Sequence, residues 1–168
     1  CAANQIVGMR ATSDTVRATL WQDGPRFIDL GVLPGRPFSE AVAINARGRV
    51  VGNSYAGLDD SGGYCMVKPR AFSWENGRLR DLGALPGDRA SEAVAINDQG
   101  QIIGHSGTAD AICSLTAKPP HLFLFSQGRM HRLSIPGGAS VMAINNGGQV
   151  IGSDLDGVSA KVFSHARR

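Results

Sequence analysis

Short apolar segments recur along the chain at a spacing of about 50 residues, and turn residues separate them. Each segment has four to six residues, is rich in β-branched and aromatic types, and is bounded by Gly, Asn, Asp or Pro, a pattern typical of a short β-strand. No ten-residue stretch has the periodicity of an amphipathic helix, so we expect almost no helix. The pattern therefore predicts an all-β protein built from an internal repeat.

Four kinds of segment follow one another in a fixed order, and we name them a, b, c and d. Segment a ends in Ala-Ile-Asn, segment b ends in glycine, segment c carries aromatic residues, and segment d runs into Pro-Gly. Segment a occurs at 41–45, 93–97 and 141–145, and segment b at 5–8, 49–52, 101–104 and 149–152. Segment c occurs at 18–21, 71–74, 122–125 and 160–163, and segment d at 28–35, 80–87 and 132–137.

Residues that repeat in every copy are expected to serve the repeat itself. Asn45, Asn97 and Asn145 open the a–b turns, where a side-chain amide can accept backbone hydrogen bonds. We expect the same of Asp29 and Asp81 in segment d. The pairs Ser39-Glu40 and Ser91-Glu92 precede segment a, either as caps of the d–a connection or as an acidic lining around an axial opening.

A repeat of about 50 residues with four antiparallel strands matches a β-propeller blade. One such unit has two apolar faces and must stack to bury them, with Trp21, Trp74 and Phe125 filling the gaps. We therefore predict a β-propeller-like array in one domain, 1–168, whose modules span approximately 1–40, 41–92, 93–140 and 141–168 and whose first and last modules are incomplete. A four-bladed ring and an arc of a larger ring, continued in a longer chain, both stay open.

The same segments resemble a known family. Residues 95–104, the aromatic run 71–77 and the Asp-Leu-Gly-x-Leu-Pro-Gly run 81–87 are together similar to the HAF repeat of bacterial extracellular repeat proteins. The tripeptide His-Ala-Phe that names the family is here Arg70-Ala71-Phe72 and His121-Leu122-Phe123. The resemblance implies an exported protein, extracellular, on the cell surface or periplasmic, and it brings no catalytic residues.

Composition narrows the function classes. Hydrophobic residues make up 42% and charged residues 18% of the 168 residues, which excludes a disordered tail. No apolar run approaches the roughly 18 residues of a membrane span. The net charge of +3 comes from scattered arginines rather than a basic cluster, so nucleic acid is not an expected partner.

Metal, cofactor and catalytic motifs are not expected. The chain has no Cys-x-x-Cys pair, and its four histidines fall at unrelated repeat positions. Asp59-Asp60 and the acids of 154–157 supply too few oxygens for calcium. Cys65 and Cys113 occupy similar places in adjacent modules and would either form a disulfide in an exported protein or stay free thiols. Cys1 would suit a lipidated start or a cut from a longer chain.

The long connections are the expected binding surface. In an up-and-down module the a–b and c–d turns share one end, and the b–c and d–a connections share the other. The b–c connections 53–70 and 105–120 are long, and long loops on a rigid scaffold commonly bind partners. The candidate contact residues are Arg36, Phe38, Tyr55, Tyr64, Lys68, Arg70, Arg89, Lys118 and His121.

We therefore expect a noncatalytic, exported scaffold that binds a protein or glycan through its b–c and d–a connections. One alternative is a propeller-type carbohydrate-active enzyme, a lyase or hydrolase. It would need two carboxylates roughly 5–9 Å apart, for which Glu40, Asp88 and Glu92 are the candidates. Another alternative is a structural segment of a longer surface protein, for which exposed apolar end faces would be the sign.

Overall fold

The computed structural model describes residues 4–59, 65–107, 120–134, 140–153 and 160–164, in which every regular element is a β-strand. No helix occurs among these residues, and so none that could cross a membrane. The strands are β1 Ile6–Ala11, β2 Val16–Gln22, β3 Arg26–Asp29, β4 Phe38–Ile44, β5 Val50–Tyr55, β6 Gly57–Asp59, β7 Cys65–Val67, β8 Arg70–Glu75, β9 Arg78–Asp81, β10 Ala90–Ile96, β11 Ile102–Gly107, β12 His121–Ser126, β13 Arg129–Leu133, β14 Ser140–Ile144, β15 Gln149–Ser153 and β16 Ala160–Ser164.

The strands form four antiparallel sheets in chain order, which we call modules 1 to 4. Module 1 is β1–β2–β3, module 2 is β4–β5–β8–β9, module 3 is β10–β11–β12–β13 and module 4 is β14–β15–β16. Strand a begins at Phe38 and Ala90, three residues before segment a, because the preceding Ser and Glu join the sheet ladder; in module 4 it begins at Ser140, one residue before segment a. A further ribbon, β6–β7, lies inside the b–c connection of module 2 and was not predicted.

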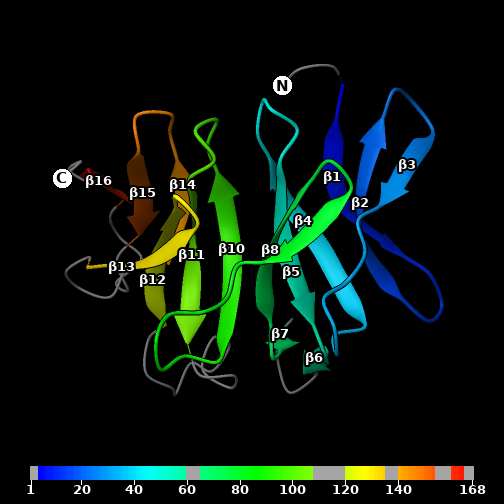
Figure 1. The fold of residues 1–168 in the computed structure, drawn as a ribbon, viewed down its shortest axis with the longest axis horizontal. Helices are drawn as coiled ribbons and strands as arrows, with labels where there is room; N and C mark the ends of the chain where they lie inside the picture. The colour runs from blue at the N-terminus through cyan, green and yellow to red at the C-terminus, as the bar shows by residue number, and fades with distance from the viewer. Residues whose placement is uncertain (1–3, 60–64, 108–119, 135–139, 154–159, 165–168) are drawn as a thin grey trace.

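The modules stand side by side, with β1–β3 at one end and β14–β16 at the other (Figure 1). The a–b turns lie at the top of this view, and the b–c connection that carries β6 and β7 lies at the bottom, which we call the loop face. Within the described residues β1 pairs only with β2, so no sheet pairing closes the array into a ring. The all-β prediction is confirmed as an open series of antiparallel sheets.

Each inner module buries both faces. Successive strand residues point to opposite sides of a sheet. Val50 accordingly packs with module 1 and Val51 with module 3, while Ile102 packs with module 2 and Ile103 with module 4. The three resulting apolar layers lie between neighbouring sheets, and each is centred on such aliphatic residues from segment b. Phe125 is buried as predicted, whereas Trp74 only borders its layer.

The glycine that ends segment b makes room for the bulged strand beside it. Strand a carries a register shift between Ala41 and Ala43, and the equivalent shifts recur in β10 and β14. A Cβ at Gly52 would overlap the carbonyl oxygen of Glu40, and one at Gly104 would overlap that of Glu92. The bulge at the Ala-x-Ala of segment a and the glycine that ends segment b therefore form one close contact between neighbouring strands.

Serine hydroxyls fasten module 1 to module 2 and module 2 to module 3. The Ser39 hydroxyl accepts a hydrogen bond from the Ala18 amide (2.9 Å) and donates to the Gly31 carbonyl (2.7 Å). Ser91 makes the same two bonds to Ala71 and Gly83 one module later. The predicted capping role of these serines is confirmed, and the capped groups belong to the preceding module.

Asparagines form a second set of contacts between modules. Asn45 Oδ1 accepts backbone bonds within its own turn, as predicted. Its Nδ2 donates to the Asn97 carbonyl at 3.0 Å, and the Nδ2 of Asn97 donates to the Asn145 carbonyl at 3.0 Å. We call this row the asparagine ladder. It crosses the boundary between modules 2 and 3 and the boundary between modules 3 and 4, at the end of the array where the a–b turns lie. We call each boundary between neighbouring modules a seam.

Candidate functional site

The loop face gathers the d–a connections and the b–c connection of module 2. The first two d–a connections turn at Leu-Pro-Gly, where the Arg36 amide donates to the Leu33 carbonyl (3.1 Å) and the Asp88 amide to the Leu85 carbonyl (2.9 Å). The Leu33 amide in turn donates to the Ser54 hydroxyl of module 2 at 3.1 Å. Each connection is thereby held against the following module, which makes this face rigid at its base.

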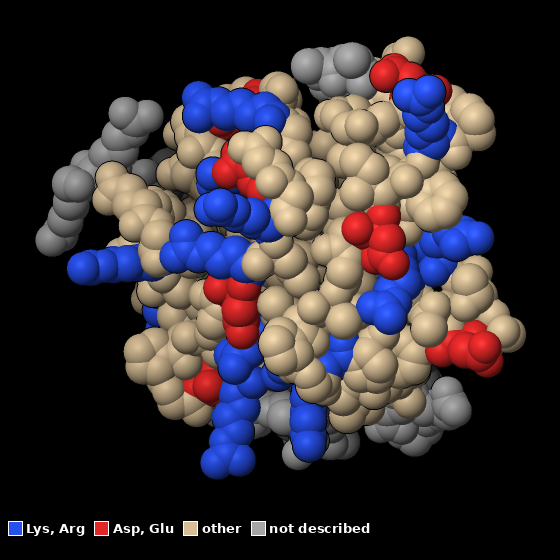
Figure 2. Space-filling view, turned by 45° about the vertical axis from the view of Figure 1, so that its right-hand side comes forward, with Lys and Arg blue, Asp and Glu red and all other residues tan. Residues whose placement is uncertain are grey.

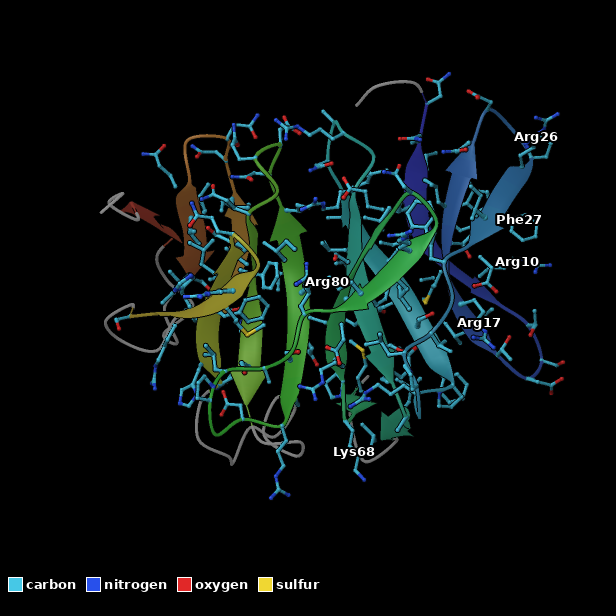
Figure 3. All side chains as sticks on the ribbon, viewed as in Figure 1. Arg10, Arg17, Arg26, Phe27, Lys68 and Arg80 are labelled. Atoms are coloured by element: carbon cyan, nitrogen blue, oxygen red, sulfur yellow. The ribbon has the colours of Figure 1, made fainter. Side chains whose placement is uncertain are left out.

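Two of the predicted contact residues are exposed on this face. Lys68 lies just after β7 in a left-handed conformation (φ 51°) and points away from the molecule at the bottom of Figure 3. Arg89 is also exposed, and its amide donates to the Gly107 carbonyl at 2.9 Å. Leu58, on the β6–β7 ribbon, is exposed as well, and sequence reasoning missed it because three-residue strands leave no clear alternation.

Arg36 and Arg70 instead lie together at the seam between modules 1 and 2. Arg36 donates from Nε to the Lys68 carbonyl (3.0 Å). Its pKa is lowered, first by burial and then by the charge of Arg70. Arg70 Nε is buried without a hydrogen-bond partner, and the closest acid atom is Asp81 Oδ2 at 3.6 Å. These two arginines therefore belong mainly to the packing between modules.

His121 occupies the same place at the next seam, where an aspartate replaces one of the two arginines and a histidine the other. Its Nδ1 lies 2.9 Å from Oδ2 of Asp88, whose side chain is almost fully buried. Asp88 stands where the preceding module has Arg36, and His121 stands where it has Arg70. The carboxylate candidate Asp88 is thus engaged in a seam contact.

The remaining predicted contact residues either pack against one another or lie outside the described residues. Phe38 and Tyr55 stack on one another with their ring centroids 5.7 Å apart, and Tyr55 is buried. Tyr64, Lys118 and Cys113 lie outside the described residues. Cys65 lies in β7 opposite Asp59, and a disulfide to Cys113 stays a prediction.

A row of polar side chains follows the strand-a edges of modules 2 to 4. Asn53 donates from Nδ2 to Glu40 Oε1 (3.2 Å) and accepts from the Ala93 amide at Oδ1 (2.8 Å). Sequence reasoning had named Glu40 but missed Asn53. The sequence could have indicated Asn53, because it follows the segment-b glycine at the position that His105 takes one module later.

Glu92 and His105 form the next pair of this row. They are opposite one another on β10 and β11. Burial, together with the charge of Glu40, raises the pKa of Glu92 to about 7. Burial lowers the pKa of His105, whose Nε2 lies 3.5 Å from the Ser140 hydroxyl. Among the described side chains no three of His, Cys, Asp or Glu are grouped to hold a metal ion.

Charge over the surface is mixed. Figure 2 shows Lys and Arg side chains projecting at the lower edge, while acidic and basic groups alternate across the middle of the view. Comparisons with protein-family models, with curated proteins and with solved structures find no match to the chain. The resemblance to the HAF repeat therefore stays a prediction.

Proposed function

We propose that this protein is a noncatalytic, exported, β-propeller-like scaffold that binds an acidic glycan or protein through its loop face. The supporting observation is the charge of the described side chains on that face. Lys68 and Arg89 are exposed, whereas the nearby Asp88 is buried against His121. Exposed cations beside an acid that is held in another contact favour a partner that carries carboxylate or sulfate groups.

The scaffold suits this role because the connections are fixed at their bases. Ser54 holds the Leu33 amide, and Ser106 holds the Leu85 amide one module later, at 3.0 Å. A pre-organised surface loses little conformational entropy on binding. The long b–c connections then supply the variable part of the surface.

The test is binding to an array of acidic and neutral glycans. The double variant Lys68→Glu, Arg89→Glu should reduce binding to acidic glycans at least tenfold, because it reverses both exposed charges. Arg129→Glu is the matched control, since Arg129 is exposed at the c–d turn of module 3, away from the loop face. Binding that survives the double variant, or equal binding of neutral glycans, contradicts the proposal.

One observation favours a second candidate, a structural segment of a longer surface protein. Ile6 is 67% and Ile151 41% exposed, whereas the same repeat positions in the inner modules, Val50 and Ile103, are fully buried. Apolar side chains on open end faces are typical of contact surfaces. If these faces associate, the double variant Ile6→Lys, Ile151→Lys should abolish concentration-dependent self-association in light scattering. A chain that is monomeric before the change contradicts this candidate.

A further inference from the structure

The outward face of module 1 contains a pocket of about 260 Å³ near the loop-face end of β1 and β2. Its volume is below the roughly 300–1,000 Å³ usual for drug-sized ligands, so it suits one group the size of a monosaccharide. The pocket lies on the side of β1–β3 that faces away from the other sheets, where Figure 3 labels several of its residues. Its lining consists of Arg10, Thr12, Thr15, Arg17, Thr19, Phe27 and Asp29.

Two guanidinium groups flank this pocket without an acid partner in the described part of the chain. Arg10 and Arg17 are opposite one another on β1 and β2, so their side chains share a face. Neither makes a salt bridge with a described residue. The Arg10 guanidinium lies 4.7 Å from the centre of the Phe27 ring, which orients it while its N–H edge stays available.

The pocket occupies the place that in module 2 receives the Leu-Pro-Gly turn of the preceding module. There Ser54 accepts the Leu33 amide, and Ser106 does the same for Leu85 in module 3. Module 1 has Arg10 at this position. Because a guanidinium has five donors and no acceptor, it cannot receive a backbone N–H. The site is therefore suited to a ligand that brings acceptor oxygens.

The rest of the lining is uncharged or acidic. The Thr12 and Thr15 hydroxyls are 3.1 Å apart and hold each other in place. Asp29 accepts the Gly31 amide at Oδ1, which leaves Oδ2 for a donor. The negative charge of Asp29 beside the arginines disfavours a dianion such as phosphate. It favours a ligand with one carboxylate and several hydroxyl donors.

From these contacts we propose that the module 1 pocket binds a uronate, a sugar ring that carries a carboxylate. Arg10 and Arg17 hold the carboxylate, Asp29 and the Thr12 and Thr15 hydroxyls bond the sugar hydroxyls, and the Phe27 ring packs against the apolar side of the sugar. This site is separate from the exposed Lys68 and Arg89. It does not depend on the proposed role of the loop face.

The experiment is calorimetric titration of the whole chain with trigalacturonate, with the neutral galactose trisaccharide and inorganic phosphate as companion probes. Arg10→Ser, the residue that module 2 uses, should weaken trigalacturonate binding at least tenfold. Thr19→Phe, again the module 2 residue, should fill the pocket and abolish binding. Arg26→Ser is the matched control, because Arg26 is exposed on β3 but does not line the pocket, and it should change the affinity less than twofold.

The outcomes separate the possible origins of binding. Loss with Arg10→Ser and retention with both Arg26→Ser and the loop-face variant Lys68→Glu, Arg89→Glu support the proposal. Equal loss with Arg26→Ser shows a general charge effect and overturns it. Equal binding of the neutral trisaccharide or of phosphate overturns the uronate assignment, and absence of trigalacturonate binding by the unmodified chain overturns the site.

Discussion

The outward face of module 1 and the equivalent face of module 2 derive from the same repeat, but one is open and the other is buried. Ile6 on β1 is largely exposed, while its counterpart Val50 on β5 is fully buried against module 1. Gly8 has only the Trp21 ring near a would-be Cβ, while Gly52 faces the backbone of β4. The repeat thus places the same residue type in two different environments.

The positions where these two faces differ show which residues respond to a neighbouring module. Arg10 stands where module 2 has Ser54, and Thr19 stands where module 2 has the buried Phe72. Serine and phenylalanine suit contact with a stacked sheet, whereas the exposed Arg10 suits water or a polar ligand. Thr19 is itself buried and lines the pocket. Repeat positions that change at an open face are therefore the places to look for binding.

The largest expected effect tests the contrast between the two glycines. Gly52→Ala should destabilise the protein by about 3 kcal/mol or more, because its Cβ would overlap the Glu40 carbonyl and lie 2.6 Å from Phe72. Gly8→Ala should change stability by less than about 0.5 kcal/mol. Urea denaturation measures both. Similar values for the two variants would contradict the account of the bulged contact.

A smaller effect concerns Glu92 and pH. Its folded pKa of about 7 lies above the ordinary 4.5, so the folded chain binds more protons than the unfolded chain between these values. Stability from this group is present below pH 4.5 and is lost as the pH rises to about 7, by up to about 3 kcal/mol. Glu92→Gln should remove this dependence.

His105 provides the internal control for that measurement. Burial depresses its folded pKa, so its contribution has the opposite sign, and stability is lost as the pH falls. In Glu92→Gln the free energy of unfolding should therefore rise with pH over the range in which the unmodified chain loses stability. Parallel pH profiles for the two proteins would show that Glu92 is not buried as described.

The third effect compares Asn53 with Met9, which holds the same repeat position in module 1. Asn53→Ala leaves the Ala93 amide without its acceptor and should cost about 1–3 kcal/mol. Met9 is half exposed, and Met9→Ala should cost less than about 0.5 kcal/mol. Thermal and urea unfolding report both values. A neutral Asn53→Ala would mean that this contact does not join modules 2 and 3.

The smallest effect distinguishes a charged pair at a seam from a charged pair within one sheet. A double-mutant cycle of Asp88→Asn and His121→Gln should give a coupling of about 1 kcal/mol, because the pair is short and partly buried. The same cycle for Arg70 and Asp81 should give less than about 0.5 kcal/mol, since those atoms are 3.6 Å apart and more exposed. Equal couplings would remove the distinction between the seam pair and the pair within one sheet.

Much of the fold could be read from the sequence, because each strand has a strong local signature that the repeat confirms three or four times. The turn asparagines and the capping serines were predicted for the same reason. The β6–β7 ribbon was missed, since Gly57–Asp59 and Cys65–Val67 are too short to show a period. Ring closure could not be predicted either, because it depends on contacts between the ends of the array.

The candidate site was harder to predict. Arg36 and Arg70 are unusual in the repeat, and we interpreted such differences as contacts for a partner. In the structure they meet each other at a seam, and Asp88 and His121 show that both positions change together. A search for repeat positions that change together between modules would have identified Arg36 and Arg70 as a contact between modules. It would have left Lys68 and Arg89 as candidates for partner binding. Arg10 was not predicted as a binding residue, because the prediction relied on long connections and module 1 has only a short b–c turn.

The asparagine ladder gives the array a direction. Each side-chain amide donates to the carbonyl of the following turn, from Asn45 to Asn97 and from Asn97 to Asn145, so the bond dipoles align head to tail and polarise one another. Within the described residues the turn of Asn97 both accepts and donates this bond, while in the ladder Asn45 only donates and Asn145 only accepts. A module copied within the array would find its donor and acceptor already in place, so the number of modules can change by duplication without any new contact having to evolve.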